Sequence, residues 1–457
     1  MNIKRTLITE AIDKIDQEIL LKGWVERIRG HGKLIFFDLR DRKGLVQVVV
    51  NAEGSKNAFN EAAKIHPEFA IELVGRVNKR PQNAVNKNLI TGEIEIEAKE
   101  IVILSASETL PFDTTKQDLN LELPTLLDFR ALTLRHAKQQ MVFKVQEAIV
   151  ESFREAAKKL DCTEIFIPTI AASATEGGAE VFPVDYYGHN AYLTQSPQLY
   201  KQILAGVYER VYTIAHAYRA EPSVTTRHMS ESVQMDCEIA FIDGFSELLD
   251  DIEFVGKYVV SETFKKCQDI ISNFDKSNLL IAKEIPRLKM REAQELIFKR
   301  SGRDVRSEVD LSSEDEKEIG KWAKEEKSSD FVTITHYPAK KRAFYTYPDP
   351  QDPEYSLSYD LIFRGMEILS GSQRINDYKE LVKAIKDRGL DPKNFEIYLQ
   401  TFKYGMPPEG GFSFGLERIT MKILNLQNVR EASLFPRDME RVDERFAVLE
   451  QKDKEKS

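Results

Sequence analysis

The sequence predicts an α+β protein in which a small N-terminal β-barrel precedes a larger domain, built on a mostly antiparallel sheet flanked by helices. Two observations lead to this prediction. Short runs rich in β-branched and aromatic residues, separated by polar turns, follow one another through residues 19–104. From residue 132 onward, strand-like runs are mixed with long patterns of helical period, which is typical of α+β domains.

The first part, residues 1–104, is expected to form the barrel. Its strand-like runs include 34–37, 45–50 and 72–77, and residues 61–64 resemble the short helix that such barrels carry between strands. Roughly five strands in so short a stretch suggest the small closed barrel known as the OB-fold.

The second part, residues 132–457, follows a hinge that we place at residues 105–131, because Leu-Pro pairs bracket a polar stretch there. A long helix opens the domain, since apolar residues recur at steps of three and four through residues 142–160. Residues 246–340 are helix-prone and highly charged, and their charge pattern predicts a solvated insertion on the surface. Strands are expected at 191–195, 211–215, 234–242, 358–369 and 411–415.

The composition of the 457 residues, 42% hydrophobic and 30% charged, is that of an ordinary globular protein. We expect no membrane partner, because no apolar run approaches the ~18 residues of a membrane span. Cys162, Cys237 and Cys267 are far apart, which argues against a zinc site or a disulfide framework and predicts a cytoplasmic protein. The net charge of −9 repels nucleic acid on average, so RNA binding requires local basic patches.

Residues 23–44 form such a patch, with six Lys and Arg against three Asp and Glu. Strand alternation places Phe36 on the face opposite to its two neighbours. A base could stack on an outward Phe36, while Arg29 holds a phosphate and the amide of Gln47 reads a base edge. The alternative is that Phe36 belongs to the barrel core.

A second polar segment, residues 216–241, is expected to be two strands joined by a turn-rich loop. Arg219 and Glu221 would lie on the first strand, with Arg227 and His228 in the loop. Arginines in such a place suit phosphate, because the guanidinium fork presents paired donors. The alternative is a surface hairpin with ordinary ion pairs.

A third segment, residues 358–374, places Asp360 and Glu367 in otherwise apolar strands. Carboxylates there are costly unless they are paired or bind a cation, and together with the Ser370 hydroxyl they are oxygen ligands suited to Mg²⁺. Arg374 is then free to meet an anion. The alternative is that these carboxylates are exposed on the open face of a sheet.

The stretch 410–419 matches neither of the two familiar glycine-rich nucleotide loops. Gly410, Gly411 and Gly415 lack Cβ atoms, so a planar base could lie close against the strand backbone. Arg418, in the first turn of the following helix, could cover the other face of the base and reach a phosphate. The sequence therefore predicts the floor of an adenine pocket, with tight strand-to-helix packing as the alternative for the glycines.

Taken in order, these segments resemble the three motifs of the class II aminoacyl-tRNA synthetases, most closely the short aspartate-specific enzymes of archaeal and eukaryotic type. Residues 123–137, with the helix after them and Pro168, resemble the first motif, which is a dimer-interface element in the family. Residues 218–241 resemble the second motif and 410–419 the third. The barrel resembles the family's anticodon-binding domain, so the resemblance covers nearly the whole chain.

The resemblance implies an ATP site and an aspartate site. The ATP-binding residues it implies are Arg219 for the α-phosphate, Glu221 for the adenine amino group, Arg227 and His228 near the terminal phosphates, Glu367 with Ser370 for magnesium, and Gly415 with Arg418 for the base. The aspartate-binding residues it implies are Arg374 and Lys201 for the side-chain carboxylate, Ser196, Gln198 and Asp236 around the α-amino group, Ser370, and Glu176 in a loop that closes over the amino acid. Catalysis would rest on Arg219, Arg418 and Glu367. On the barrel, Phe36 and Gln47 would stack on and read the middle anticodon base, with Arg29 nearby.

The implied activity is that of an aspartate–tRNA ligase. L-Aspartate and ATP with Mg²⁺ would form aspartyl-adenylate, and the aspartyl group would pass to the terminal adenosine of tRNA(Asp), with tRNA(Asn) left open as a second acceptor. The implied assembly is a homodimer. An asparaginyl-tRNA synthetase is the nearest alternative, although Lys201 favours aspartate, and a non-catalytic RNA-binding paralogue is another. One departure from the family pattern is Ser232, which stands where many relatives carry an aromatic residue that stacks on adenine.

Overall fold

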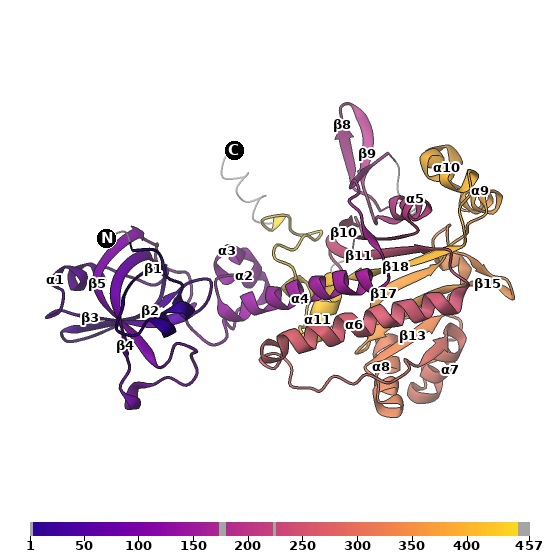
Figure 1. The fold of residues 1–457 in the computed structure, drawn as a ribbon. Coiled ribbons are helices and arrows are strands. Elements are labelled where there is room, and N and C mark those ends of the chain that lie inside the picture. The colour runs from indigo at the N-terminus through magenta and orange to yellow at the C-terminus, as the bar shows by residue number, and fades with distance from the viewer. Residues whose placement is uncertain (1–2, 173–179, 223–224, 447–457) are drawn as a thin grey trace. The chain divides into compact units, whose positions relative to one another are not determined.

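The computed structural model describes residues 3–172, 180–222 and 225–446, and these fall into two compact units, Met1–Leu121 and Glu122–Ser457 (Figure 1). The predicted hinge 105–131 is divided between them, because α2 (Leu123–Asp128) and α3 (Arg130–Thr133) belong to the second unit. No helix among the described residues is both long and apolar enough to cross a membrane.

Five strands close into the barrel of the first unit in the order β1-β2-β3-β5-β4. They are β1 (Glu18–His31), β2 (Leu34–Arg40), β3 (Leu45–Asn51), β4 (Ala70–Lys79) and β5 (Ile94–Ser105), with α1 (Lys56–Ala62) between β3 and β4. Alternate residues of β2 are buried, and these include Ile35 and Phe37. Phe36 therefore points outward, and the alternative that it belongs to the barrel core is wrong.

An eight-stranded sheet forms the centre of the second unit, and its pairings are antiparallel except at the two edges. In spatial order the strands are β12 (Arg287–Lys289), β13 (Phe331–Thr335), β16 (Ser358–Phe363), β17 (Met366–Gln373), β18 (Glu409–Gly415), β11 (Glu231–Ala240), β10 (Arg210–Tyr218) and β6 (Thr163–Glu164). The single strand predicted at 358–369 is two strands, because Arg364 and Gly365 turn the chain with positive φ angles of 48° and 72°.

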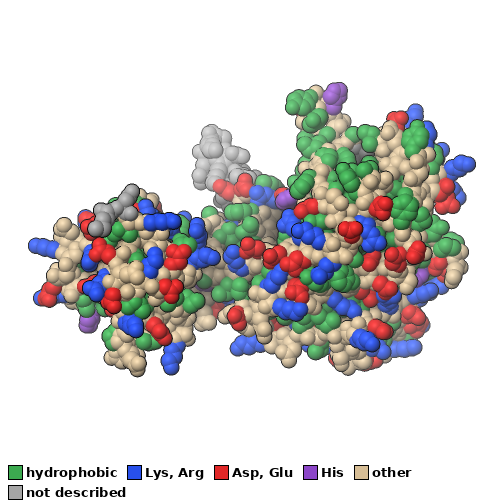
Figure 2. All heavy atoms as spheres, in the orientation of Figure 1, with side chains coloured by type: hydrophobic (Ala, Val, Ile, Leu, Met, Phe, Trp, Pro, Cys, Tyr) green, Lys and Arg blue, Asp and Glu red, His purple; other side chains and the backbone are tan. Residues whose placement is uncertain are grey.

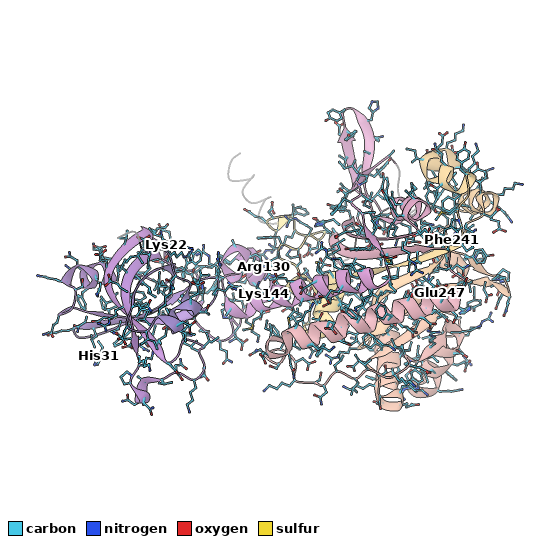
Figure 3. The ribbon with its side chains drawn as sticks, in the orientation of Figure 1. Lys22, His31, Arg130, Lys144, Phe241 and Glu247 are labelled. Carbon is cyan, nitrogen blue, oxygen red and sulfur yellow. The ribbon has the colours of Figure 1, made fainter. Side chains whose placement is uncertain are left out.

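Two long helices, α4 (Ala137–Lys159) and α6 (Phe245–Ile271), pack side by side on one face of this sheet (Figure 1). The predicted apolar stripe of α4 is buried there and includes Val142, Val145 and Phe153. Arg130 of α3, labelled in Figure 3, donates to the carbonyl oxygens of Ser433 (2.7 Å) and Leu434 (2.9 Å).

The segment 246–340 is not the solvated insertion that its charge predicted. Eleven residues of α6 are buried, and most of them belong to the main core. Helices α7 (Met290–Ser301) and α8 (Ser313–Lys327) bury a further apolar cluster against β13. Many charges on one side of a helix conceal an apolar stripe on the other, and only that stripe decides where the helix packs.

The other strands form the small sheet β7 (Ile170–Ala171), β8 (Pro183–Tyr186) and β9 (His189–Leu193) and the hairpin β14 (Pro348–Asp349) and β15 (Asp352–Ser356). The other α-helices are α5 (Gln198–Tyr208), α9 (Tyr378–Asp387), α10 (Glu396–Lys403) and α11 (Leu416–Ile423). Helix α11 packs against α4 and adds Ile419 and Ile423 to the main core. Figure 2 shows Lys and Arg interspersed with Asp and Glu over the visible face of each unit, so this face carries no broad field of one sign.

Candidate active site

A polar cavity of about 630 Å³ lies on the face of the sheet opposite to α4 and α6. Side chains of β11, β16, β17 and β18 form its floor, and its walls come from three segments, 219–229, 310–316 and 341–346. The cavity collects residues from the second and third motif-like regions, 218–241 and 410–419, and from the polar segment 358–374, which supports the expectation that these three segments act together.

Strand register explains which residues reach the cavity floor. Asp360, Ser370, Ser413 and Asp236 are direct partners on four adjacent antiparallel strands. Directly opposed residues point to the same face, so these four polar side chains form one row across the sheet. The next row contains Glu238, opposite Gly411.

Lys201, from α5, lies buried at one end of the floor with 1% of its side chain exposed. Its Nζ is 2.8 Å from Oδ2 of Asp236 and 3.1 Å from Oε2 of Glu238, and it donates to the carbonyl oxygen of Phe412 (3.2 Å). Burial opposes the ammonium charge, but the two carboxylates hold the pKa of Lys201 above its usual value. Lys201 therefore carries its charge inside the pocket.

Arg374 supplies a second buried cation beside it. Its Nε and Nη2 donate to the two carboxylate oxygens of Glu238 at 2.7 and 3.3 Å, and Nη2 also donates to Oε1 of Gln198 (3.2 Å). Nη1 donates to the Ser372 hydroxyl at 2.6 Å. Despite burial, Arg374 and Lys201 hold the pKa of Glu238 below its usual range. The sequence placed Glu238 with Asp236 on the second strand of the polar segment but assigned it no binding role, because only tertiary structure shows that it holds both cations in place.

The three glycines of 410–415 serve different purposes. A Cβ on Gly410 would meet Leu248 of α6 at 2.4 Å, so this glycine faces the core and not a base. A Cβ on Gly411 would come within 2.1 Å of Oε2 of Glu238, so this glycine makes room for a buried carboxylate. Only Gly415 lies at the cavity, below the side chain of Arg418. The prediction that all three glycines line the adenine pocket is therefore wrong for Gly410 and Gly411, and only Gly415 lies at the cavity.

Arg219 and Glu221 lie just beyond β10, which ends at Tyr218, and not on the strand as expected. The Arg219 amide still donates to the carbonyl oxygen of Ser230 (2.9 Å), the next position of the ladder after Tyr218 and Glu231, so Arg219 is anchored at the start of the loop. Nη1 of Arg219 is 3.7 Å from Oε1 of Glu221. The ring of His228 bonds the Thr225 hydroxyl (2.7 Å), and burial, then Arg418, lowers the pKa of His228. His228 is thus favoured as a neutral imidazole in a cationic surrounding.

Arg227 is held by the start of α8, in the segment predicted to be a surface insertion. It donates to the Ser313 hydroxyl (2.6 Å) and to Oε1 of Glu316 (2.9 Å). The other oxygen of Glu316 accepts from the Glu367 amide (3.0 Å). Glu316 therefore links the loop that carries Arg227 to β17. Its sequence context, a run of charges on a helix, gave no signal of this role.

Glu367 points into the cavity, and its Oε1 is 3.2 Å from Nη1 of Arg418. Oδ1 of Asp360 is enclosed without a hydrogen-bond partner, while Oδ2 accepts from Arg342 (2.9 Å). Arg342, which the sequence did not single out, also donates to the Ser370 hydroxyl (3.3 Å). The described residues contain no cluster of three or more His, Cys, Asp or Glu that could hold a metal. Two carboxylates with a hydroxyl fit Mg²⁺ when phosphate oxygens complete its shell.

The remaining predicted residues of this site are partly described. Ser196, Gln198 and Ser232 line the cavity, and Ser232 lies opposite Ala217 on β10. No aromatic residue stands at position 232, as the sequence indicated. Glu176 lies outside the described residues.

The barrel carries a second candidate site on its outer surface. The guanidinium of Arg29 lies 5.5 Å from the ring centre of Phe36 and donates to Oε1 of Gln47 (3.1 Å). The Gln47 amide donates in turn to Oε2 of Glu95 (3.1 Å). These contacts hold the Gln47 amide on the same face of the barrel as the half-buried, outward-facing ring of Phe36, an arrangement that suits stacking on a base and reading of its edge. Glu95 was missed, because nothing in its own segment indicates a partner on β3.

Residues 122–439 match the family model of the class II tRNA synthetases (D, K and N), and residues 19–104 match the OB-fold nucleic acid binding domain. The chain therefore belongs to the class II aminoacyl-tRNA synthetases. It is 40% identical over 439 residues to an aspartate–tRNA(Asp/Asn) ligase of Thermus thermophilus, with 96% of this chain and 99% of the relative covered. It is 36% identical to an aspartate–tRNA(Asp) ligase of Pyrococcus horikoshii, with 95% and 98% covered.

Solved structures give the same family. A crystal structure of the asparaginyl-tRNA synthetase of Pyrococcus horikoshii with asparaginyl-adenylate superposes with a TM-score of 0.87 at 30% identity. The superposition covers 96% of this chain and 99% of the other. Because aspartate and asparagine enzymes share this fold, the amino acid must be argued from the pocket itself.

Proposed function

We propose that the protein is an aspartate–tRNA ligase, which forms aspartyl-adenylate from L-aspartate and ATP and transfers the aspartyl group to tRNA. One observation carries the choice of amino acid: two buried cations, Lys201 and Arg374, stand side by side at one end of the cavity. An aspartate side chain needs positive charge there, whereas the neutral amide of asparagine does not. Asp236 on the same floor suits the α-amino group.

The ATP end of the cavity suits electrostatic catalysis. The α-carboxylate of aspartate is already ionised, so no general base is needed for its attack on the α-phosphate. Arg219 would balance the charge that grows on that phosphate, and Arg418 would hold the base and the terminal phosphates. Glu367, with Ser370 and Asp360, would hold Mg²⁺, which when bound neutralises phosphate charge. Arg227, fixed by Glu316, would orient the leaving pyrophosphate.

The barrel would bind the anticodon through Phe36, Gln47 and Arg29, and tRNA(Asp) is the proposed partner, with tRNA(Asn) as the second acceptor to test. A homodimer is part of the proposal. The segment after the edge strand β6 supports it, because Phe166 (88% exposed) and Ile170 (41% exposed) present apolar side chains there, and an exposed apolar surface beside a sheet edge favours an interface. The cytoplasmic location stays a prediction.

ATP–pyrophosphate exchange tests the proposal. We expect exchange to depend on L-aspartate and Mg²⁺, to be lost on chelation, and to be absent with L-asparagine alone. Exchange driven by asparagine would select the asparaginyl alternative, and no exchange with either amino acid would select the non-catalytic one. Charging of purified tRNA(Asp) and tRNA(Asn) side by side then identifies the acceptor.

A further inference from the structure

Glu409 is a fully buried carboxyl group that the proposed reaction leaves without a role. It is the first residue of β18, and register places it on the same face as Gly411 and diagonal to Glu238 on β11. Glu409 and Glu238 each have 0% exposure, and neither lines the cavity itself. The sheet thus brings two enclosed carboxyl groups together directly beneath the amino-acid end of the site.

Only one of these two groups has cations as direct partners. Glu238 receives Nε and Nη2 of Arg374 and lies 3.1 Å from Nζ of Lys201. Glu409 receives one neutral donor, Nε2 of Gln202, at 2.6 Å on Oε1. Its Oε2 is enclosed and accepts no hydrogen bond. A carboxylate with a single amide donor is an expensive buried charge, whereas a carboxylic acid in the same place is not.

Glu238 is the carboxylate diagonal to Glu409 on the neighbouring strand, and Oε2 of Glu409 is enclosed without a partner, so a proton on Glu409 would have an acceptor in Glu238. The other groups around Glu409 cannot take over this task. Tyr398 of α10 donates its hydroxyl to Oε1 of Gln202 (3.0 Å), and the Arg374 amide bonds the Glu409 carbonyl (2.9 Å). The Arg374 guanidinium acts on the Glu409 carboxyl through its charge, which lowers the pKa of Glu409 by less than burial and Glu238 raise it. Burial, then Glu238, raises the pKa of Glu409 well above its usual value.

We propose that Glu409 is a positioning residue of the amino-acid pocket, a neutral acid whose proton bridges to Glu238 and which thereby tunes the pocket for an anionic side chain. With Glu409 neutral, the two cations Lys201 and Arg374 are balanced by Asp236 and Glu238 alone. Ionised Glu409 would add an uncompensated negative charge and oppose aspartate, whose net charge is negative, more than neutral asparagine. This inference rests on the proposed function for the identity of the amino acid.

Infrared difference spectra test the proton without any substrate. We expect the spectrum of the unchanged protein minus that of Glu409→Gln, near neutral pH, to contain the carbonyl stretch of a protonated carboxylic acid. Glu396→Gln, which changes an exposed acid on α10, should give carboxylate bands instead. Carboxylate bands from Glu409 would overturn the proposal. Because no ligand is present, a failure of the proposed function leaves this result interpretable.

Ligand affinity tests the effect on the pocket. Calorimetry near neutral pH should show Glu409→Gln binding aspartate and asparagine each within about twofold of the unchanged protein, because the amide keeps the neutral state. An ionised Glu409 would instead make the variant bind aspartate at least about tenfold more tightly than the unchanged protein with asparagine nearly unchanged, and that result would overturn the proposal. In the unchanged protein, the ratio of the two affinities should stay within about twofold from about pH 5.5 to about pH 7.5, where both α-amino groups remain protonated. A fall in aspartate affinity alone over that range would overturn the proposed tuning even if the variant does not fold. If neither amino acid binds, the proposed function fails, whereas the infrared result still stands.

Discussion

Gly411 lies directly beneath the carboxylate of Glu238, and the space it leaves is occupied by that group. A Cβ at Gly411 would come within 2.1 Å of Oε2 of Glu238 and 2.3 Å of the Cys237 carbonyl oxygen. A Cβ at Gly415, four residues along the same strand, would meet Arg418 at an ordinary 3.6 Å. The two glycines therefore have different roles, although the sequence had assigned both to the adenine floor. Gly411 makes room for the buried carboxylate of Glu238, and Gly415 lies at the cavity beside Arg418.

Gly411→Ala should damage the aspartate end of the site. Glu238 must shift away from Arg374 and Lys201, which we expect to lower the free energy of unfolding by about 1–3 kcal/mol and to raise the KM for aspartate at least about tenfold. Gly415→Ala should fold normally and raise only the KM for ATP, since its methyl group would occupy the place proposed for the base. Thermal unfolding and exchange kinetics on both variants measure this. Equal effects of the two substitutions on both substrates would contradict it.

Glu316→Gln should weaken ATP and leave aspartate unaffected. The neutral amide keeps the size of Glu316 but loses the charge that holds Arg227, so the arginine is less well oriented toward phosphate. We expect the KM for ATP to rise about five- to tenfold, which corresponds to roughly 1–1.4 kcal/mol. Exchange kinetics with ATP varied at saturating aspartate measure it.

Glu314→Gln is the matched control for this prediction, because Glu314 lies two residues away on α8 with 75% of its side chain exposed. It should change neither KM. A rise in the KM for ATP in both variants would mean that the net charge of the helix matters and not the contact to Arg227.

The fold could be predicted wherever a local hydrophobic pattern was compatible with only one secondary structure and one buried face. Alternation in β2 put Phe36 outside the barrel, and the stripe of α4 put Val142 against the sheet. The prediction of a solvated insertion at 246–340 was wrong, because the many charged residues of this segment concealed the apolar stripe of its helices. Helix α6, one of the two helices on the sheet, was consequently assigned to the surface.

A site residue could be predicted only where the residues around it in the sequence already indicated its role. Arg374 and Lys201 could be predicted as cations of the site from the sequence, whereas the contacts by which Glu238 and Glu316 hold cations in place could not. Glu238 reaches its cations only through the register of strands that are distant in the sequence. Glu316 reaches Arg227 only because α8 packs back against the loop that carries Arg227. Arg342, which bonds Asp360, is a further case.

Arg374→Lys should show that geometry matters as well as charge. An ammonium cannot reproduce the two parallel bonds to Glu238, so the variant keeps the charge and loses the fork. We expect the KM for aspartate to rise about 100-fold, or roughly 3 kcal/mol, with the KM for ATP within about twofold. Arg306→Lys, on an exposed arginine paired with Asp304, is the control. An unchanged KM for aspartate would remove Arg374 from the amino-acid site.

Arg374→Ala is expected to be a poorer test than the lysine variant. Removal of one partner of a buried ion pair costs about 3–5 kcal/mol, because the other charge is left uncompensated. Loss of exchange in the alanine variant would thus mix unfolding with loss of binding, and its free energy of unfolding has to be measured first.

Glu417 should make the second unit less stable as pH rises. Burial raises the pKa of Glu417 to about 7, although the Val233 amide donates to both of its oxygens at 3.1 and 3.2 Å. In the unfolded chain the group ionises near 4.5, so between about pH 4.5 and about pH 7 only the unfolded state gains the charge. The stabilisation is complete below the lower value and is lost as pH rises through the higher one. At about 1.4 kcal/mol per pH unit, the loss amounts to about 3 kcal/mol.

Glu417→Gln should abolish this loss, because the amide oxygen can still accept from Val233 and nothing titrates. Urea unfolding at about pH 5 and about pH 8 measures the effect, with Trp322 fluorescence reporting on the second unit in a Trp24→Phe background. We expect the variant to gain up to about 3 kcal/mol relative to the unchanged protein on going from the lower to the higher pH. The same pH dependence in both proteins would show that other groups dominate, since the only difference between them is one buried carboxyl.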